Sequence, residues 1–154
     1  MKTEFEITVT IEIDAPRDAV WAIVSDPQRL PEWMEEMESA HQESSGPPGL
    51  GSVVRYTLAP GHRSGTFEVV EWEPGSTVAW DGPPLPWAGG GLRPRGSFEL
   101  TDAQGGRTRF TGRYRPELSG MQVLLRPYLK RWARRARRAS TLKLKAMAEG
   151  ERGS

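Results

Sequence analysis

Apolar and basic positions recur with a helical spacing along the last part of the chain. Between residues 119 and 148, apolar residues return at steps of three and four, which is the spacing of one face of an α-helix. A helix with such a stripe is stable when the stripe lies against another apolar surface, because intrinsic propensity contributes little. The pattern therefore predicts one long helix packed on the rest of the fold, with a kink at Pro127. The apolar stripe comprises Met121, Leu124, Leu125, Tyr128, Trp132, Ala136, Ala139, Leu142 and Ala146, and the basic face comprises Arg126, Lys130, Arg131, Arg134, Arg137 and Arg138.

Most of the remaining chain alternates between apolar and polar residues with a period of two. This is the pattern of strands with one buried and one solvated face. Short turns rich in glycine and proline separate the strands, which favours antiparallel neighbours. The predicted strands are residues 4–13, 37–44, 54–58, 66–73, 76–81, 96–100 and 108–115.

Two short helices are expected after the first strand. Asp14-Ala15-Pro16 suits a helix start, because proline fits the first turn and an acid is favourable near the positive end of the helix dipole. Asp26-Pro27 ends this first helix. A second helix is predicted from about Pro27 to Trp33.

The motifs of this region resemble the opening signature of the START-like (SRPBCC) superfamily, which includes polyketide cyclase/dehydrase proteins, lipid-transport proteins and Bet v 1-like allergens. They are Ile13-Asp14-Ala15-Pro16, Val20-Trp21, Val24-Ser25-Asp26-Pro27 and Leu30-Pro31-Glu32-Trp33. Looser matches follow at Gly51-Ser52-Val53-Val54, Glu73-Pro74-Gly75, Gly106-Arg107-Thr108 and Leu144-Lys145-Ala146, so the resemblance covers nearly the whole chain. It implies an α+β helix-grip fold, in which a curved antiparallel sheet of about seven strands (order β-α-α-β6-α) wraps around the long C-terminal helix.

The connection between residues 82 and 94 is predicted to lack regular structure. It has no hydrophobic period and contains the glycine run Gly89-Gly90-Gly91. Long irregular loops are often functional lids, and this one carries Leu85, Trp87 and Leu92. In START-like proteins the corresponding connection often covers a cavity mouth. Whether it is a lid or a solvated loop stays open.

Length and composition indicate one domain without disulfides. The 154 residues include no cysteine, and the net charge is +1. We expect a single domain over residues 1–149 and a short disordered tail over 150–154. No signal peptide or membrane span is evident, so a cytoplasmic location is the default expectation. Seventeen arginines against four lysines hint at a GC-rich bacterial source.

The charge is unevenly distributed along the chain. Residues 1–43 hold eleven acids and three bases, whereas residues 120–148 hold nine bases and no acid. Such a segment can bind an anionic membrane surface or nucleic acid, or it can be a solvated helix face. We favour the solvated face, keep membrane association as an alternative, and expect no nucleic-acid binding because no stacking platform for bases is evident.

The sequence shows no established catalytic motif. It lacks a nucleophile elbow and a phosphate-binding glycine loop. His41 and His62 are too far apart to predict a metal site, and no cofactor is expected. Glu35, Glu36 and Glu38 fit a solvated edge, while the orientation of Glu68, Glu71 and Glu99 stays open.

The most informative side chains are aromatic residues on predicted inward faces. A curved sheet around a helix leaves a wedge that such residues can line. We expect a small hydrophobic ligand, either lipid or aromatic and polyketide-like, to be bound or transported there by a monomer or homodimer. The alternative is a cyclase or aromatase in which His41, Tyr56, Tyr114 or Arg135 assists proton transfer, so enzymatic activity stays open. The predicted lining residues are Trp33, Tyr56, Trp72, Trp80, Trp87, Phe98, Phe110, Tyr114, Tyr128, Trp132 and Arg135.

Overall fold

The computed structural model describes residues 1–87 and 89–152, and its main element is a seven-stranded antiparallel sheet. The strand order is β2-β10-β9-β6-β5-β4-β3. Inward residues alternate as expected, for example Thr108, Phe110, Gly112 and Tyr114 on β10. The strands are β2 (Ile7–Ile13), β3 (Met37–Gln42), β4 (Val53–Leu58), β5 (Arg63–Glu73), β6 (Thr77–Asp81), β9 (Arg95–Ala103) and β10 (Arg107–Tyr114).

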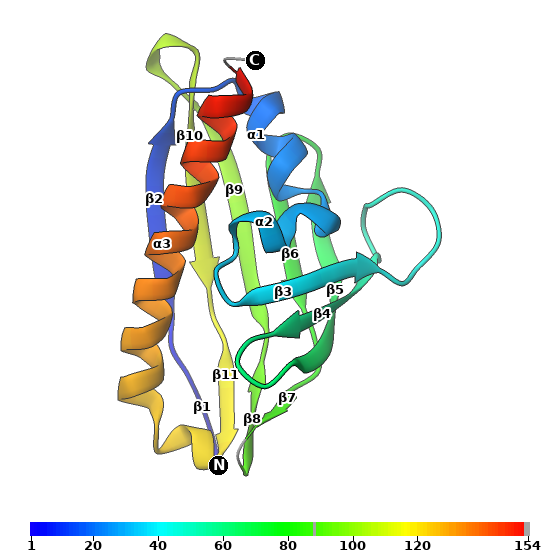
Figure 1. Ribbon diagram of the computed structural model, residues 1–154, viewed down its shortest axis with the longest axis vertical. Coiled ribbons are helices and arrows are strands. Elements are labelled where there is room, and N and C mark those ends of the chain that lie inside the picture. Colours follow the sequence, from blue (N-terminus) through cyan, green and yellow to red (C-terminus); the bar gives the residue numbers. More distant parts are fainter. Residues whose placement is uncertain (88, 153–154) are drawn as a thin grey trace.

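The helices cover one face of this sheet. α1 (Arg17–Val24), the 3₁₀ turn η1 (Pro27–Arg29) and α2 (Leu30–Trp33) connect β2 to β3. The long helix α3 (Arg126–Arg152) runs the length of the molecule, with α1 and α2 beside its C-terminal half (Figure 1). The predicted α+β helix-grip fold, with its order β-α-α-β6-α in the main sheet, is therefore confirmed. No helix within residues 1–87 and 89–152 is long and apolar enough to cross a membrane.

A second, four-stranded sheet was not predicted. It consists of β1 (Lys2–Glu4), β11 (Glu117–Gly120), β8 (Gly90–Arg93) and β7 (Leu85–Trp87), in that order. The prediction that 82–94 lacks structure was wrong, because β7 and β8 form a hairpin there; Ala88 lies outside the described residues. Glycines and prolines hid the strand period, and β8 pairs with β11, which is distant in sequence. A Cβ on Gly90 would lie 2.2 Å from the Ser119 carbonyl oxygen, so this close pairing requires glycine.

The long helix starts later than predicted. Ser119 and Gly120 belong to β11, a 3₁₀ turn η3 (Met121–Val123) follows, and α3 begins at Arg126. Pro127 is therefore the second residue of α3 rather than an interior one. In the first turn the missing N–H of proline costs no helical hydrogen bond, so the reason for the predicted kink disappears. At its other end α3 continues through 150–152, which were expected to be a disordered tail.

The predicted apolar stripe of this helix is not its buried face. Met121, Leu124, Leu125, Tyr128, Trp132 and Leu142 are all exposed. The buried residues are Leu129, Arg137, Ser140, Thr141, Leu144 and Ala148. These also follow a spacing of three and four, but hydropathy does not reveal them because several are small or polar. Ser140 Oγ accepts a hydrogen bond from the Glu35 amide, and Thr141 Oγ1 donates to the Arg137 carbonyl, which makes their burial possible.

Candidate ligand-binding cavity

A cavity of about 480 Å³ lies between the sheet, the helices and the β7–β8 hairpin. Its size is within the range of about 300–1,000 Å³ that is typical of small-molecule pockets. The lining is predominantly apolar and comes from every layer of the fold, including Leu30 of α2, Phe67 of β5, Leu85 of β7 and Leu129 of α3. The long-range pairing of the second sheet therefore supplies one wall of the cavity.

Aromatic rings on neighbouring strands form a continuous row along the cavity. The ring of Tyr56 on β4 stacks on Phe67 of β5 at 5.9 Å between centroids. Phe67 contacts Trp80 of β6 at 6.3 Å, and Trp80 contacts Phe98 of β9 at 4.6 Å. Tilted contacts at these separations are favourable for aromatic pairs. The row gives the cavity a continuous aromatic wall whose rings are tilted against one another.

Glycines make room for the rings of this surface. A Cβ on Gly65 would lie 2.8 Å from the Tyr56 hydroxyl, and one on Gly112 would lie 2.9 Å from the Tyr114 hydroxyl. A Cβ on Gly96 would lie 2.6 Å from the Trp80 ring. Each ring therefore lies over a glycine on its own or a neighbouring strand. Glycine makes the apolar alternation of these strands look weak in the sequence. Its missing side chain nevertheless leaves the space that each aromatic ring occupies.

A polar cluster of three cavity-lining residues interrupts the apolar surface: Glu36, Tyr114 and Arg137. Arg137 Nη2 donates to Glu36 Oε1, and the two side chains are 6% and 14% exposed, respectively. Arg137 Nη1 also contacts Met34 Sδ at 3.3 Å, and the guanidinium carbon lies 5.1 Å from the centre of the Tyr114 ring. The ion pair anchors α3 to the segment that follows α2.

Two polar atoms of this cluster are buried without a partner. Glu36 Oε2 and the Tyr114 hydroxyl have no partner in good hydrogen-bond geometry within the described part of the chain; the Tyr114 hydroxyl interacts only weakly with the Arg137 guanidinium, which favours the ionised phenol. Buried polar atoms are normally paired, so unpaired ones in a cavity wall indicate sites for a ligand or water. Glu36 Oε2 can accept a hydrogen bond, while the Tyr114 hydroxyl can donate or accept one. A ligand hydroxyl can pair with either atom, as a donor to Glu36 Oε2 or as a donor or acceptor to the Tyr114 hydroxyl.

Burial makes both lining phenols harder to ionise. Desolvation raises the pKa of Tyr114 to about 12, and Glu36 adds to the rise while the nearby Arg137 opposes it. Desolvation likewise raises the pKa of Tyr56 to about 12, opposed by Arg63. Both hydroxyls remain hydrogen-bond donors at neutral pH. At the Tyr56 end, the Arg63 guanidinium lies 4.4 Å from the centre of the Trp87 ring.

The structure brings most of the predicted lining residues together. Tyr56, Trp72, Trp80, Trp87, Phe98, Tyr114, Tyr128 and Trp132 all line the cavity. Trp33 and Phe110 do not, because they pack behind Phe98 in the core and are fully buried. Arg135, expected either to line the cavity or to extend outward from the edge of the apolar stripe, does not line it and is exposed on α3.

Glu36 and Arg137 were missed by the sequence analysis. Glu36 was assigned to a solvated edge and Arg137 to a solvated helix face. The available signal was the second stripe of α3, through Leu129, Ala133, Arg137, Ser140 and Leu144, which has the same helical spacing. A basic residue at its centre indicates either a buried partner or a site.

The remaining candidates for chemistry lie outside the cavity. His41, Glu68 and Glu71 are exposed. His62, also exposed, has Nδ1 2.7 Å from Glu38 Oε2. Across residues 1–87 and 89–152, no group of three or more histidines and carboxylates is arranged to hold a metal ion.

Comparison with known proteins places this geometry in a family. Residues 4–149 match the family described as polyketide cyclase/dehydrase and lipid transport. Among solved structures, the Zhui aromatase/cyclase from Streptomyces sp. R1128 has a TM-score of 0.75 and 16% identity, covering 96% of this chain and 94% of that one. A Thermus thermophilus protein has a TM-score of 0.74 and 16% identity, with coverages of 96% and 99%.

A plant protein shares the same fold. The ginseng major latex-like protein 151 from Panax ginseng has a TM-score of 0.66 and 12% identity, covering 94% of this chain and 97% of that chain. No curated protein matches the sequence. At these identities the structural likeness concerns the fold alone.

Proposed function

Because the chain belongs to the polyketide cyclase/dehydrase and lipid transport family, we propose that it binds a small, largely apolar molecule carrying one hydroxyl group. The observation that carries this proposal is an apolar cavity with the unpaired pair Glu36 Oε2 and Tyr114 Oη in its wall. A ligand hydroxyl donates to the carboxylate and accepts from the phenol, so both buried atoms are satisfied.

The shape of the lining favours a flat ligand. The rings from Tyr56 to Phe98 line the cavity, and stacking or edge contacts of an aromatic ligand with such rings add to the free energy of apolar burial. A fused aromatic or polyketide-like ring system matches this surface. The alternative ligand is a lipid, whose acyl chain would be buried in the cavity without stacking on the aromatic rings.

Tryptophan fluorescence can test the proposal, since Trp72, Trp80, Trp87 and Trp132 line the cavity. We expect a tricyclic phenol to bind more tightly than the same hydrocarbon without its hydroxyl, by at least the roughly fivefold to tenfold that one buried hydrogen bond contributes. Tyr114→Phe should reduce that preference, because only the hydrogen bond to Glu36 remains, and leave hydrocarbon binding unchanged. Equal affinity of wild type for the two compounds would contradict the hydroxyl site, and no binding of either would contradict the cavity proposal.

A second candidate function is a cyclase or aromatase that uses the same cavity. The specific observation is that a carboxylate and a neutral phenol, together with Arg137, face one small volume. Glu36 can take a proton from a carbon between two carbonyls; the resulting carbanion attacks the carbon of another carbonyl group, and Tyr114 can donate a proton to the oxygen of that group. The cavity itself holds the chain in a folded, reactive conformation.

Co-expression with a polyketide synthase distinguishes binding from catalysis. We expect a catalytic protein to change the ratio of cyclised products, and Glu36→Gln to abolish that change. Because Glu36 also pairs with Arg137 and accepts the ligand hydroxyl, urea denaturation and titration with the hydrocarbon show whether the variant is still folded and still binds. If wild type and Glu36→Gln give the same products as the synthase alone, the cyclase function is contradicted for that synthase's intermediates, and binding is the supported function.

A further inference from the structure

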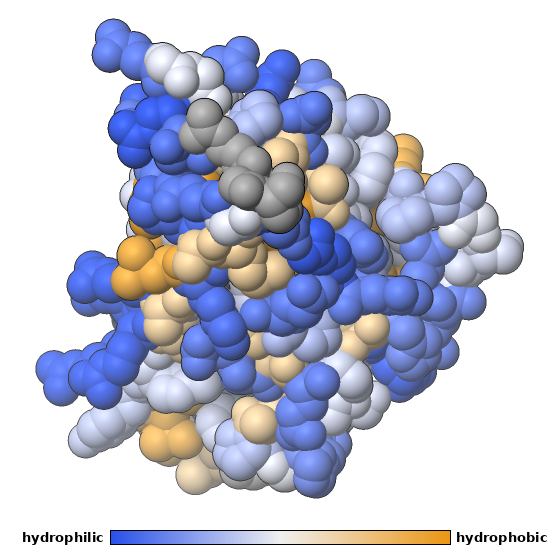
Figure 2. All heavy atoms as spheres, turned by 45° about the horizontal axis from the view of Figure 1, so that its top comes forward, coloured by the Kyte–Doolittle hydropathy of each residue, from blue (hydrophilic) through white to orange (hydrophobic). Residues whose placement is uncertain are grey.

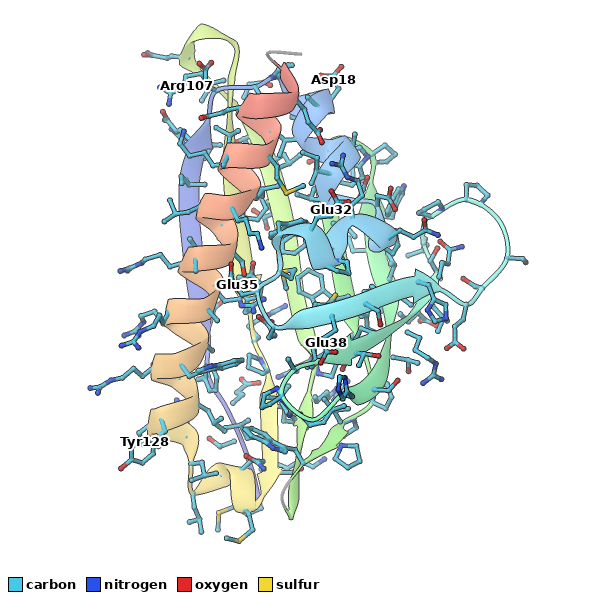
Figure 3. The ribbon with its side chains drawn as sticks, viewed as in Figure 1. Asp18, Glu32, Glu35, Glu38, Arg107 and Tyr128 are labelled. Atoms are coloured by element: carbon cyan, nitrogen blue, oxygen red, sulfur yellow. The ribbon has the colours of Figure 1, made fainter. Side chains whose placement is uncertain are left out.

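Large apolar side chains are exposed together at the start of α3. Among the described residues, nine large hydrophobic residues are exposed, and five of them fall between positions 121 and 132. Leu124 is 69% exposed and Tyr128 is 76% exposed. Figure 3 shows Tyr128 pointing outward from the lower end of α3. Exposed apolar groups that gather in one place indicate an interaction site. The five residues are Met121, Leu124, Leu125, Tyr128 and Trp132.

Exposed arginines accompany these apolar residues. Arg131, Arg134, Arg135 and Arg138 are all exposed, and within the described residues none of them forms an ion pair. Nitrogen-tipped side chains project from this part of α3 away from the sheet (Figure 3). We call the five apolar residues and these four arginines the apolar–basic surface.

Most arginines elsewhere form ion pairs, with Arg63, Arg115 and Arg126 as exceptions among the described side chains. Arg17, Arg29, Arg55, Arg93 and Arg113 all pair with carboxylates. No acid occurs between residues 118 and 148, so the four arginines of the apolar–basic surface have no local partner. Among the described residues none of the four forms an ion pair, although Glu6 lines the same surface depression as Arg134 and Arg138; the remaining positive charge is complementary to an anionic partner.

The apolar–basic surface adjoins the cavity. Tyr128 and Trp132 are exposed and also belong to the cavity lining, so they form part of its rim. On the helix, Arg131 and Arg135 lie three residues after Tyr128 and Trp132, and each pair shares one face. The tip of the β7–β8 hairpin is close by, because a Cβ on Gly89 would lie 3.1 Å from Met121 Cγ.

We propose that the apolar–basic surface docks on an anionic lipid surface, with the cavity rim facing the lipid. A lipid interface matches every class of side chain present. Leucine and methionine enter the acyl boundary, tryptophan and tyrosine prefer the interfacial region, and arginine attracts anionic headgroups. Nucleic acid would satisfy the arginines but not the exposed aliphatic residues.

Docking gives the cavity a direct route to the lipid phase. An apolar ligand then passes between bilayer and cavity across a rim that carries Tyr128 and Trp132, without crossing water. The docking proposal does not depend on the proposed ligand, because vesicle binding is measured with an empty cavity. Loss of docking and loss of ligand binding are thus separate results.

Co-sedimentation with vesicles tests the proposal. We expect the protein to bind vesicles of phosphatidylglycerol and phosphatidylcholine in equal parts, to bind pure phosphatidylcholine vesicles weakly, and to dissociate as salt is raised. Arg131→Gln and Arg135→Gln should each reduce the partition coefficient by roughly fivefold. Leu124→Ser should reduce it by a similar factor, because burial of about 40 Å² of apolar surface in the interface contributes about 1 kcal/mol, which corresponds to about fivefold.

Matched substitutions elsewhere serve as controls. Leu50→Ser removes another leucine, which is 72% exposed, and Arg115→Gln removes an exposed arginine that follows β10 directly. Both should leave vesicle binding unchanged. Fluorescence titration with the tricyclic phenol should give wild-type affinity for Leu124→Ser, showing that the cavity is intact.

Three results would overturn the proposal. The first is equal sedimentation with anionic and neutral vesicles, or with neither. The second is an equal effect of the control and surface substitutions. The third is a wild-type dimer in multi-angle light scattering that Leu124→Ser converts to monomer, because the surface would then be covered by a second copy of the chain.

Discussion

In the C-terminal half of α3, from Arg137 to Ala148, small and polar side chains are buried, whereas in the N-terminal half large aromatic and aliphatic side chains are exposed. Ser140, Thr141, Leu144 and Ala148 are almost inaccessible to solvent, while Tyr128 and Trp132 are at least half exposed. Small residues allow the C-terminal half to approach β2, α1 and α2 closely. The difference shows that one helix combines a packing segment with an interaction segment.

Surface composition supports the same distinction. On the face shown in Figure 2, hydrophobic residues form small, separated patches within a largely hydrophilic surface. Scattered apolar residues of this kind are normal and need no explanation. The run of exposed apolar residues from Met121 to Trp132 is different because it is concentrated in one short segment and carries unpaired arginines.

Arg137 marks the boundary between the two halves, and its removal should have the largest effect on stability. Arg137→Met leaves Glu36 buried without its partner, which should lower the free energy of unfolding by about 3–5 kcal/mol. Urea denaturation measures the change. Arg138→Met, one residue further on the exposed side, is the control and should be nearly neutral. A similar loss in both variants would show that the ion pair contributes no more than a surface charge.

Leu144 tests the packing segment. Leu144→Ala should lower the free energy of unfolding by about 3 kcal/mol, because it removes a fully buried side chain and leaves a cavity. Leu142→Ala changes the same residue type on the exposed side of the same turn, where the leucine is 55% exposed, and should cost less than about 1 kcal/mol. Thermal and urea unfolding measure both changes. Equal losses of stability in Leu144→Ala and Leu142→Ala would contradict the assignment of Leu144 to the packing segment.

The pH dependence of stability tests the burial of Tyr114. Its pKa is about 12 in the folded protein and about 10 when unfolded, so the neutral phenol favours the folded state. This contribution is fully present below pH 10 and is lost as the pH rises towards and beyond 12. The stability difference between wild type and Tyr114→Phe should therefore shift by about 2 kcal/mol between pH 10 and 12.

Absorbance titration of the tyrosinate band is the direct measurement. Wild type should show a component that titrates near pH 12 and is absent in Tyr114→Phe. Tyr56→Phe should remove a second late component in the same way. If the spectrum of Tyr114→Phe loses amplitude only near pH 10, the Tyr114 hydroxyl is accessible to water and the polar end of the cavity is hydrated.

The interaction segment should give the smallest effect on stability. Leu124→Ser and Tyr128→Ser should each change the free energy of unfolding by no more than about 0.5 kcal/mol, because both side chains are largely exposed. Urea denaturation would contradict this assignment if either variant lost as much stability as Leu144→Ala. If Leu124→Ser and Tyr128→Ser are as stable as wild type but bind vesicles more weakly, the interaction segment contributes to docking and not to folding.

Much of the fold could be predicted because its patterns are local. Alternation on β10, from Thr108 to Tyr114, fixes which residues face inward, and the motifs around Asp26-Pro27 fix the short helices and carry the family resemblance. Eight of the eleven predicted lining residues do line the cavity, and most of them lie on strands, where parity decides the inward face. The β7–β8 hairpin escaped prediction because its partner, β11, is distant in sequence.

By itself, the sequence determined the strand parity, the short helices and the presence of a long basic helix near the C-terminus. Only the tertiary structure decided which face of that helix is buried, because two stripes of α3 have helical spacing and hydropathy favours the exposed one. The buried face instead contains Ser140 and Thr141, whose hydroxyls are hydrogen-bonded, and Arg137, whose charge is paired with that of Glu36. The hydropathy of a residue reports only its own preference for water or for an apolar environment. Close packing and charge pairing also depend on the part of the fold against which the helix lies.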